Sequence, residues 1–256
     1  LTCDVAREGD DLCTFGVFDR AAFSLVKFDD DHPGWIAHSD LMAVVGRCVH
    51  AIRLYPNAAM ICIDDTGLGG GVTDRLREIQ FSNERNADGS YKVPSTISVI
   101  PVKFGAKASR DDRFKQKKDE LWWAGREAIR TLKIAMPDDD EIRSWRCPRG
   151  SDFKLQMTSA LYEYDSTDRI DVLDKRVGGK EKTKTLPTKS PDLAHAFILG
   201  VRYYLRQNEE KERVEENLDQ QSALHRMVQQ AAKTAIDRTT QTGSAGLAHD
   251  PYRRRR

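Results

Sequence analysis

Three aspartates stand where an apolar segment meets a turn, and they define the chemistry that this sequence could perform. Asp4 lies in the opening apolar segment, Asp64 directly follows the apolar run 60–63, and Asp192 lies at the start of an expected helix. Carboxylates at such positions supply the oxygen ligands that Mg²⁺ and Mn²⁺ prefer. The pattern therefore indicates metal-assisted phosphodiester chemistry.

Asp4 is the first of these candidates. A carboxylate inside a strand costs free energy unless it is paired, exposed at the end of a sheet or bound to a metal. The alternative is an ordinary aspartate at an edge or a turn. The acidic turn at residues 8–11 contains Asp10 and Asp11. Either residue could supply a further metal ligand, or the turn could be a solvated hairpin turn.

Asp64 follows a compact apolar run that is typical of a buried parallel strand, and ligand sites form at the C-terminal ends of such strands. Glycines occupy positions 67 and 69–71. They would let backbone and substrate approach closely because they lack a side chain. A Walker A phosphate loop is excluded, since no Lys-Ser or Lys-Thr pair follows. A simple turn remains an alternative for the glycines alone.

Asp192 follows Ser190 and Pro191, which together indicate the start of a helix. An acid in the first turn can simply complement the helix dipole and cap free N–H groups. His195 lies three residues further on and hence on the same helical face. A lone histidine is usually a packed or surface residue, but beside Asp192 it becomes a candidate metal ligand or proton carrier.

Two lysine- and arginine-rich segments are candidates for contact with DNA phosphates. They would let a polyanion approach a negatively charged site, although runs of charge are usually solvated faces. Trp122 and Trp123 are expected in the core or against a partner rather than under DNA bases. The basic candidates are Lys103, Lys107, Arg110, Arg113, Lys182, Lys184 and Lys189.

Composition sets the limits of these hypotheses. The 256 residues include 41 basic and 40 acidic ones, so a nucleic-acid partner cannot be inferred from the net charge of +1. No apolar run reaches the roughly 18 residues of a membrane span, and no signal peptide is recognisable. The five cysteines are odd in number and form no CxxC pair, so the sequence predicts neither a zinc site nor a disulfide framework. This use of cysteine indicates a reducing, intracellular setting. The absence of an initiator Met at Leu1 leads us to expect a domain of a longer protein.

The pattern of apolar residues predicts an α/β fold of the ribonuclease-H-like class. Hairpin-linked strands are expected at 1–5, 13–19 and 22–28, followed by parallel strands at 58–63 and 97–102 in one mixed sheet. Helices are expected at 39–54, 72–78, 110–132 and 190–205, with loops at 81–92 and 177–189. An added hairpin is expected from 155–164 and 169–173.

The composition changes beyond residue 207, which predicts two parts. Residues 1–206 would form the ribonuclease-H-like domain. Residues 207–256 would form a helical C-terminal tail, which is charged at first and ends on a disordered basic tip at Arg253–Arg256.

Four blocks of this sequence together resemble the nuclease domain of tailed-bacteriophage large terminase subunits. They are Asp4-Val5-Ala6 with Gly9-Asp10-Asp11, then residues 63–72, then Asp119-Glu120-Leu121-Trp122-Trp123, then residues 189–194. The blocks occur in the order of the family and cover about residues 1–205. One departure is His195, where the family often has a second Asp.

The resemblance implies a ribonuclease-H/RuvC-like endonuclease that cuts concatemeric viral DNA during genome packaging in the host cytoplasm. The matched acids are Asp4, Asp64 and Asp192, with Asp10 or Asp11 as an accessory. The ATPase half of the family, with its Walker motifs, is absent from this chain. The implied partners are therefore double-stranded DNA, an ATPase domain of the same longer protein, and in addition the portal and the small terminase subunit.

We expect two-metal hydrolysis. Asp4 would bridge two Mg²⁺ or Mn²⁺ ions roughly 3.5–4 Å apart, and Asp64 and Asp192 would each complete one coordination shell. Cutting would be largely independent of sequence, because such a site grips the backbone phosphate. Two alternatives remain: a RuvC-like junction resolvase, and a module that docks on the portal or DNA with a nuclease that is silent in isolation.

Overall fold

The computed structural model describes residues 1–6, 11–28, 33–37, 40–148, 152–175, 181–187 and 190–210, with scattered positions up to 227. The chain divides into two compact units, Leu1–Tyr204 and Leu205–Arg256. All elements discussed below belong to the first unit. The expected basic tip, Arg253–Arg256, lies outside the described residues, and the functional division of the chain into a nuclease domain and a tail stays a prediction.

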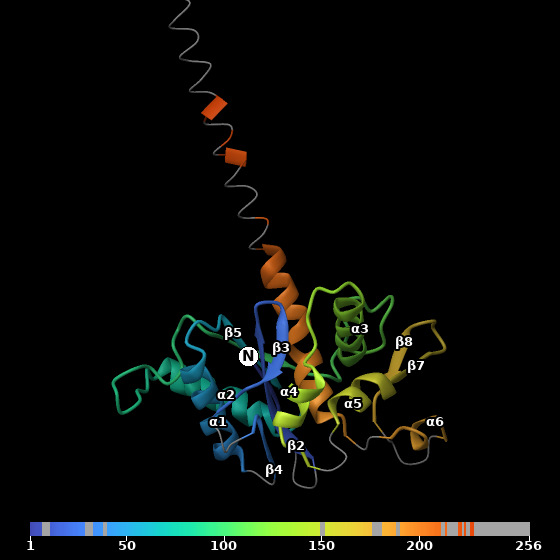
Figure 1. Cartoon of the computed structure of the whole chain (residues 1–256), viewed down its shortest axis with the longest axis horizontal. Coiled ribbons are helices and arrows are strands. Elements are labelled where there is room, and N and C mark those ends of the chain that lie inside the picture. The colour runs from blue at the N-terminus through green and yellow to red at the C-terminus, as the bar shows by residue number, and fades with distance from the viewer. Residues whose placement is uncertain are drawn as a thin grey trace, which may run out of the picture. The chain divides into compact units, whose positions relative to one another are not determined.

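A six-stranded mixed sheet organises the first unit (Figure 1). Its strand order is β3-β2-β1-β5-β6, and β4 also pairs with β2. Strands β1, β2 and β3 are antiparallel, whereas β5 is parallel to both β1 and β6. This confirms the expected fold class. The bounds are β1 Thr2–Asp4, β2 Leu12–Asp19, β3 Ala22–Leu25, β4 Trp35–Ala37, β5 Met60–Asp64 and β6 Ser98–Val102.

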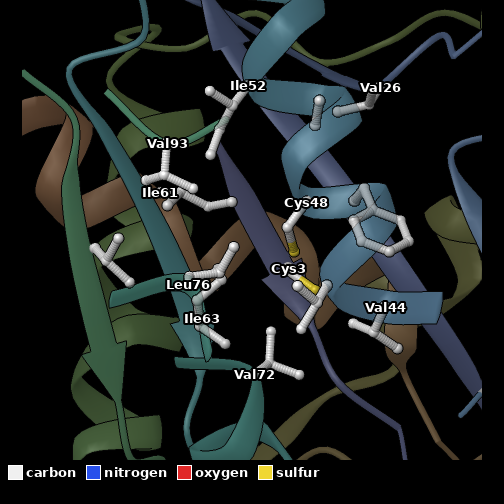
Figure 2. Packing of buried hydrophobic residues seen from close by; sticks show 14 of the residues in the cluster. Cys3, Val26, Val44, Cys48, Ile52, Ile61, Ile63, Val72, Leu76 and Val93 are labelled. Atoms are coloured by element: carbon white, nitrogen blue, oxygen red, sulfur yellow. The ribbon is translucent and has the colours of Figure 1, made fainter. Parts of the chain in front are cut away.

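Helices α1 (Leu41–Leu54) and α2 (Gly69–Phe81) cover one face of the sheet. Their apolar sides pack on inward-facing residues of β1 and β5, and Figure 2 shows Cys3 of β1 facing Cys48 of α1. Helix α1 begins where Asp40 accepts a hydrogen bond from the backbone N–H of Ala43 at 2.7 Å. This N-cap satisfies one of the free amides of the first turn.

A helix that starts at residue 192 covers the opposite face. Residues alternate between the two faces of a strand, so Thr2 points toward this helix when Cys3 points toward α1. Gly200 is needed at the contact, because a Cβ atom there would lie 2.4 Å from Thr2 Cγ2 and 2.6 Å from Phe18 Cε2. The missing side chain therefore sets how closely the helix approaches the sheet.

The sequence between β6 and this helix forms additional elements, of which α3, α5, β7 and β8 lie near one another in Figure 1. Strands β7 and β8 form the expected antiparallel hairpin, and β8 packs on α3. None of the described helices is long and apolar enough to cross a membrane. The bounds are α3 Lys117–Arg130, α4 Asp139–Ser144, α5 Phe153–Ser159, β7 Leu161–Tyr164, β8 Ile170–Leu173 and α6 Glu181–Lys184.

Several expected elements were wrong in extent. The expected strand 22–28 ends at Leu25, the expected helix 72–78 runs from Gly69 to Phe81, and the expected loop 177–189 contains α6. Two further boundaries have a local cause. The segment 155–164 was expected to be one strand, but its first half belongs to α5, because Asp152 accepts the backbone N–H of Leu155 at 2.7 Å and caps a helix there. The helix expected from residue 110 begins only at Lys117, where Asp119 accepts the backbone N–H of Gln116 at 2.8 Å. In both places a side-chain cap sets the boundary.

Candidate metal centre

Asp4 and Asp64 end neighbouring parallel strands. In the register of β1 and β5, Cys3 lies opposite Ile63, so the next residue of each strand is an aspartate. Both carboxylates are buried, with 5% of Asp4 and 7% of Asp64 exposed. The described residues give the Asp64 carboxylate one hydrogen bond, from the backbone N–H of Thr66 at 3.0 Å. The expected pairing of these two residues at one sheet end is therefore present.

Asp192 is fixed beside them by its contacts with β2. Its Oδ2 accepts the backbone N–H of Leu12 at 2.8 Å, and its Oδ1 accepts the hydroxyl of Ser190 at 2.5 Å. The hydroxyl of Thr14 donates to the carbonyl of Asp192 at 2.8 Å, and Thr14 is the register partner of Asp4. The start of the helix is thereby tied to the strand that adjoins Asp4.

Gln156 of α5 also holds this helix start, and the sequence analysis did not identify it. Its side-chain Oε1 accepts the backbone N–H groups of Leu193 and Ala194 at 2.9 and 3.0 Å. These amides belong to the first helical turn, where no backbone acceptor is available. Buried Gln156 thus performs a capping role from a segment that is distant in sequence, and no local pattern announces it.

The three carboxylates repel one another in a buried setting. Burial and, to a lesser extent, the charge of Asp4 raise the pKa of Asp64 to about 7. Burial also raises the pKa of Asp4, with a contribution from Asp192, and outweighs the opposing effect of His195. The pKa of Asp192 is raised by burial as well, and nearby Asp11 adds to the effect. Such a cluster is stabilised by cations.

His195 lies between two carboxylates. Its Nε2 is 2.9 Å from Asp174 Oδ2, and its Nδ1 is 3.7 Å from Asp4 Oδ2. Burial alone would lower the pKa of His195, but the contacts with Asp174 and Asp4 outweigh it and raise the pKa to about 10. Although Asp174 is buried, its contacts with His195, Lys118 and Trp122 hold its pKa below the usual range. The pair is therefore an ion pair as it stands.

Sequence reasoning missed Asp174. It directly follows β8, so it is a carboxylate at the end of an apolar strand, like Asp64. The indole N–H of Trp122 donates to its Oδ2 at 2.9 Å, and Lys118 Nζ lies 3.5 Å from its Oδ1. The same strand-end pattern that singled out Asp64 could have found Asp174.

The donor chemistry of this cluster fits a hard divalent cation. Asp4, Asp64 and Asp192 offer carboxylate oxygens, which suit Mg²⁺ and Mn²⁺, and their raised pKa values show that they lack sufficient positive charge. Within the described residues, no group of three or more His, Cys, Asp or Glu side chains is placed so that it could hold an ion as it stands. Coordination would therefore require these side chains to move closer together.

A cavity of about 600 Å³ adjoins the end of β5 and contains two of the expected DNA-contacting lysines. Lys103 lies in its wall with Nζ 3.4 Å from Asp65 Oδ2, and Lys107 lies nearby with Nζ 2.5 Å from Asp111 Oδ2. Arg77 and Lys117 line the same cavity. The cavity thus has a mixed but lysine-rich wall. Asp65, the residue after Asp64, lines it, whereas the three aspartates of the cluster do not.

The other expected basic contacts lie elsewhere. Arg110 pairs with Asp112 at 3.5 Å, and the guanidinium of Arg113 lies 5.0 Å from the ring centre of Trp123. Both Lys182 and Lys184 lie on α6. Lys182 Nζ lies 2.6 Å from Oε2 of Glu163 in β7. Lys189 lies outside the described residues, as does the candidate ligand Asp10.

Solved structures share this fold. The nuclease domain of the large terminase subunit of bacterial virus Sf6 matches with a TM-score of 0.55 and 13% identity, over 78% of this chain and 86% of that chain. A mutant of that domain with manganese and beta-thujaplicinol gives 0.56 and 14% at the same coverage. The mutant gp2c of the large terminase subunit from bacteriophage Sf6 with calcium gives 0.55 and 13%, again at the same coverage.

These likenesses confirm the expected resemblance at the level of the fold. No family model matches the sequence, and no curated protein matches it significantly.

Proposed function

We propose that this chain is a metal-dependent endonuclease that hydrolyses phosphodiester bonds of double-stranded viral concatemer DNA during genome packaging. One observation carries the proposal: three buried carboxylates, Asp4, Asp64 and Asp192, gather at one end of the sheet. The fold supports it, because the solved structures that share the fold include nuclease domains of a large terminase subunit.

In this proposal, Asp4, Asp64 and Asp192 hold two Mg²⁺ or Mn²⁺ ions, with His195 and Asp11 as further ligands. Such ions would polarise a phosphoryl oxygen and lower the pKa of the attacking water. The protein contributes by burying the carboxylates, because electrostatic interactions are stronger in a buried site than in bulk solvent. Similar solved structures that contain manganese or calcium support a divalent cation.

Lys103 and Lys107 are the strongest candidates for contact with the DNA backbone, because they line a cavity together with Asp65, the residue after Asp64. Their ammonium groups would offset the negative charge that otherwise repels a polyanion. Phosphate contacts carry no sequence information, so we expect little sequence preference in cutting. An ATPase domain of the same longer protein, the portal and the small terminase subunit complete the proposed set of partners.

The test is nicking of supercoiled plasmid in Mn²⁺ by wild type and by the variants Asp64→Asn and Asp192→Asn. We expect both variants to fall to the background rate, since each removes one negative oxygen donor while keeping the size of the side chain. Asp140→Asn is the matched control, because Asp140 lies on α4 and its side chain is 91% exposed. Wild-type activity in either site variant would contradict the proposal.

A second substrate distinguishes the proposal from a junction resolvase. A four-way DNA junction and a linear duplex of the same length are compared at equal concentration. Comparable cutting of the two supports a packaging endonuclease, whereas strong preference for the junction would favour the resolvase.

A further inference from the structure

A buried line of side chains leads from the β7–β8 hairpin to the aspartate cluster. Asp174 Oδ2 lies 2.9 Å from His195 Nε2, and His195 Nδ1 lies 3.7 Å from Asp4 Oδ2. All three side chains are at most 7% exposed. The histidine therefore has one nitrogen toward the hairpin and the other toward the cluster.

Asp174 is itself held in place from two sides. The indole N–H of Trp122 donates to the same oxygen that contacts His195, at 2.9 Å. Lys118 Nζ lies 3.5 Å from the other oxygen and also donates to the carbonyl of Val172 in β8. Helix α3 and the hairpin thus fix the carboxylate before it meets the histidine.

The ring of His195 has little room to turn. It meets the ring of Phe104 edge-on with 5.0 Å between the centroids, and the ring of Trp122 edge-on with 6.4 Å between the centroids. Because an ionised carboxylate only accepts hydrogen bonds, Nε2 must carry a proton at this contact. The nitrogen that faces Asp4 is then Nδ1.

We propose that Asp174 is a positioning residue that holds His195 with its Nδ1 directed toward the metal-binding carboxylates. This inference rests on the proposed function, since it concerns the metal site of that nuclease. Histidine ligands of metals commonly donate their second ring N–H to a carboxylate, which fixes the tautomer and the orientation of the ring. Asp174 is such a carboxylate, because it contacts Nε2 of His195. Asp4 lies on the Nδ1 side of the same ring.

The competing explanation is that Asp174 only satisfies Trp122 and Lys118 and so stabilises the fold. The two explanations differ in one respect. A positioning residue acts through His195, so removing it should matter little once His195 is gone. A structural residue should have the same effect on metal affinity whether or not His195 is present.

The experiment measures Mn²⁺ affinity by calorimetry in wild type, Asp174→Ala, His195→Ala and the double variant. We expect Asp174→Ala to weaken affinity about 10- to 100-fold, the usual effect of removing such a partner. The double variant should bind no more weakly than His195→Ala. Glu120→Gln is the matched control, because buried Glu120 also lies on α3 but contacts Ser109 and Lys117 rather than Lys118 or Asp174, and it should keep Mn²⁺ affinity within about twofold.

Unchanged affinity in Asp174→Ala would overturn the inference, and so would an equal reduction with and without His195. The proposed function fails in a different way, namely if wild type does not bind Mn²⁺ or if Asp64→Asn binds it as well as wild type.

If Asp174→Ala does not fold, ¹⁵N NMR of the histidine rings in Mg²⁺-saturated wild type and Asp174→Asn decides instead. A proton on Nε2 of His195 in wild type supports the inference. An unprotonated Nε2 overturns it. The amide oxygen of Asn can still accept from Nε2 beside Trp122, so Asp174→Asn should keep this tautomer and bind Mg²⁺ more tightly than His195→Ala.

Discussion

Asp4 lies next to Asp64 because β1 and β5 run parallel with Cys3 opposite Ile63. The backbone hydrogen bonds of the sheet therefore force two carboxylates together, and neither can leave without breaking the register. In the absence of a cation, the repulsion between these carboxylates lowers the free energy of unfolding. Three of the predictions below follow from this relationship and from the charges around it.

The first prediction concerns stability without metal. The folded-state pKa of Asp64 is raised from 3.8 to about 7, so folding favours its neutral form. The stability that the protein gains from protonated Asp64 is fully present below the unfolded pKa near 4. It is lost as pH rises through the folded-state pKa of about 7. Asp64→Asn stays neutral, so we expect its melting temperature to exceed that of wild type at pH 8 by at least about 2–4 °C, the equivalent of about 1 kcal/mol.

Calorimetry in a chelating buffer at pH 5 and pH 8 measures this difference. The advantage of Asp64→Asn should shrink at pH 5, where wild-type Asp64 is also mostly neutral. An advantage that is equal at both pH values would contradict the link to ionisation. Asp140→Asn, which alters an exposed carboxylate, should melt like wild type at both pH values.

The second prediction concerns the pH dependence of metal binding. A proton on Asp64 competes with a cation for the same carboxylate, and the raised pKa places this competition near neutral pH. We expect the Mn²⁺ affinity of wild type to rise by at least about tenfold per pH unit between pH 5.5 and 6.5. Isothermal titration across this range checks it. An affinity that does not change with pH would show that Asp64 is not protonated in the metal-free protein.

The third prediction concerns DNA binding. Replacing Lys103 or Lys107 with Ala should weaken binding to any duplex and reduce the slope of log affinity against log salt by about 1 for each phosphate that the protein no longer neutralises. Fluorescence anisotropy with a duplex in Ca²⁺ at several salt concentrations gives both quantities. Lys154→Ala is the matched control, because Lys154 is also exposed but pairs with Asp139 away from the cavity. Equal slopes of log affinity against log salt in all three variants would show that Lys103 and Lys107 do not contact DNA phosphates.

The fourth prediction tests the packing that brings Asp192 to the sheet. A Cβ atom on Gly200 would overlap Thr2 and Phe18, so Gly200→Ala should destabilise the protein by about 1–3 kcal/mol, as overpacking usually does. Gly46 provides the matched control within helix α1, since a Cβ there meets nothing within 4 Å. Gly46→Ala should stabilise by roughly 0.5–1 kcal/mol. Urea unfolding measures both changes, and equal stability of the two variants would refute the close approach.

The sequence allowed the sheet and its carboxylates to be predicted because their signals are local. Asp64 follows an apolar run, and the start of the last helix is marked by Ser190 and Pro191. Gln156 escaped prediction because its role depends on segments that meet only in the folded chain. Asp174 carries the local pattern of a carboxylate after an apolar strand, but the identity of its partners depends on the fold. Asp174 contacts Trp122 and His195, which lie 52 and 21 residues away.

The misplaced boundaries have a related cause. Apolar residues in 155–164 satisfy a strand pattern, but the Asp152 cap and the burial of Phe153 and Gln156 favour a helix in the first part. Periodicity over so few residues does not separate the two structures. In the same way, the basic residues after 110 suggested a helix that starts only at Lys117.

The dependence of Asp192 on Leu12 and Thr14 has a consequence for the order in which the cluster of carboxylates is assembled. Ribosomes release the chain from its N-terminus, so β1, β2 and β5 can pair while the last helix has yet to be made. During that interval the chain carries two of the three carboxylates and the strand that will receive the third. The cluster of three carboxylates is thus complete only once the final helix of the first unit has been made, and the proposed nuclease would lack its third carboxylate until then.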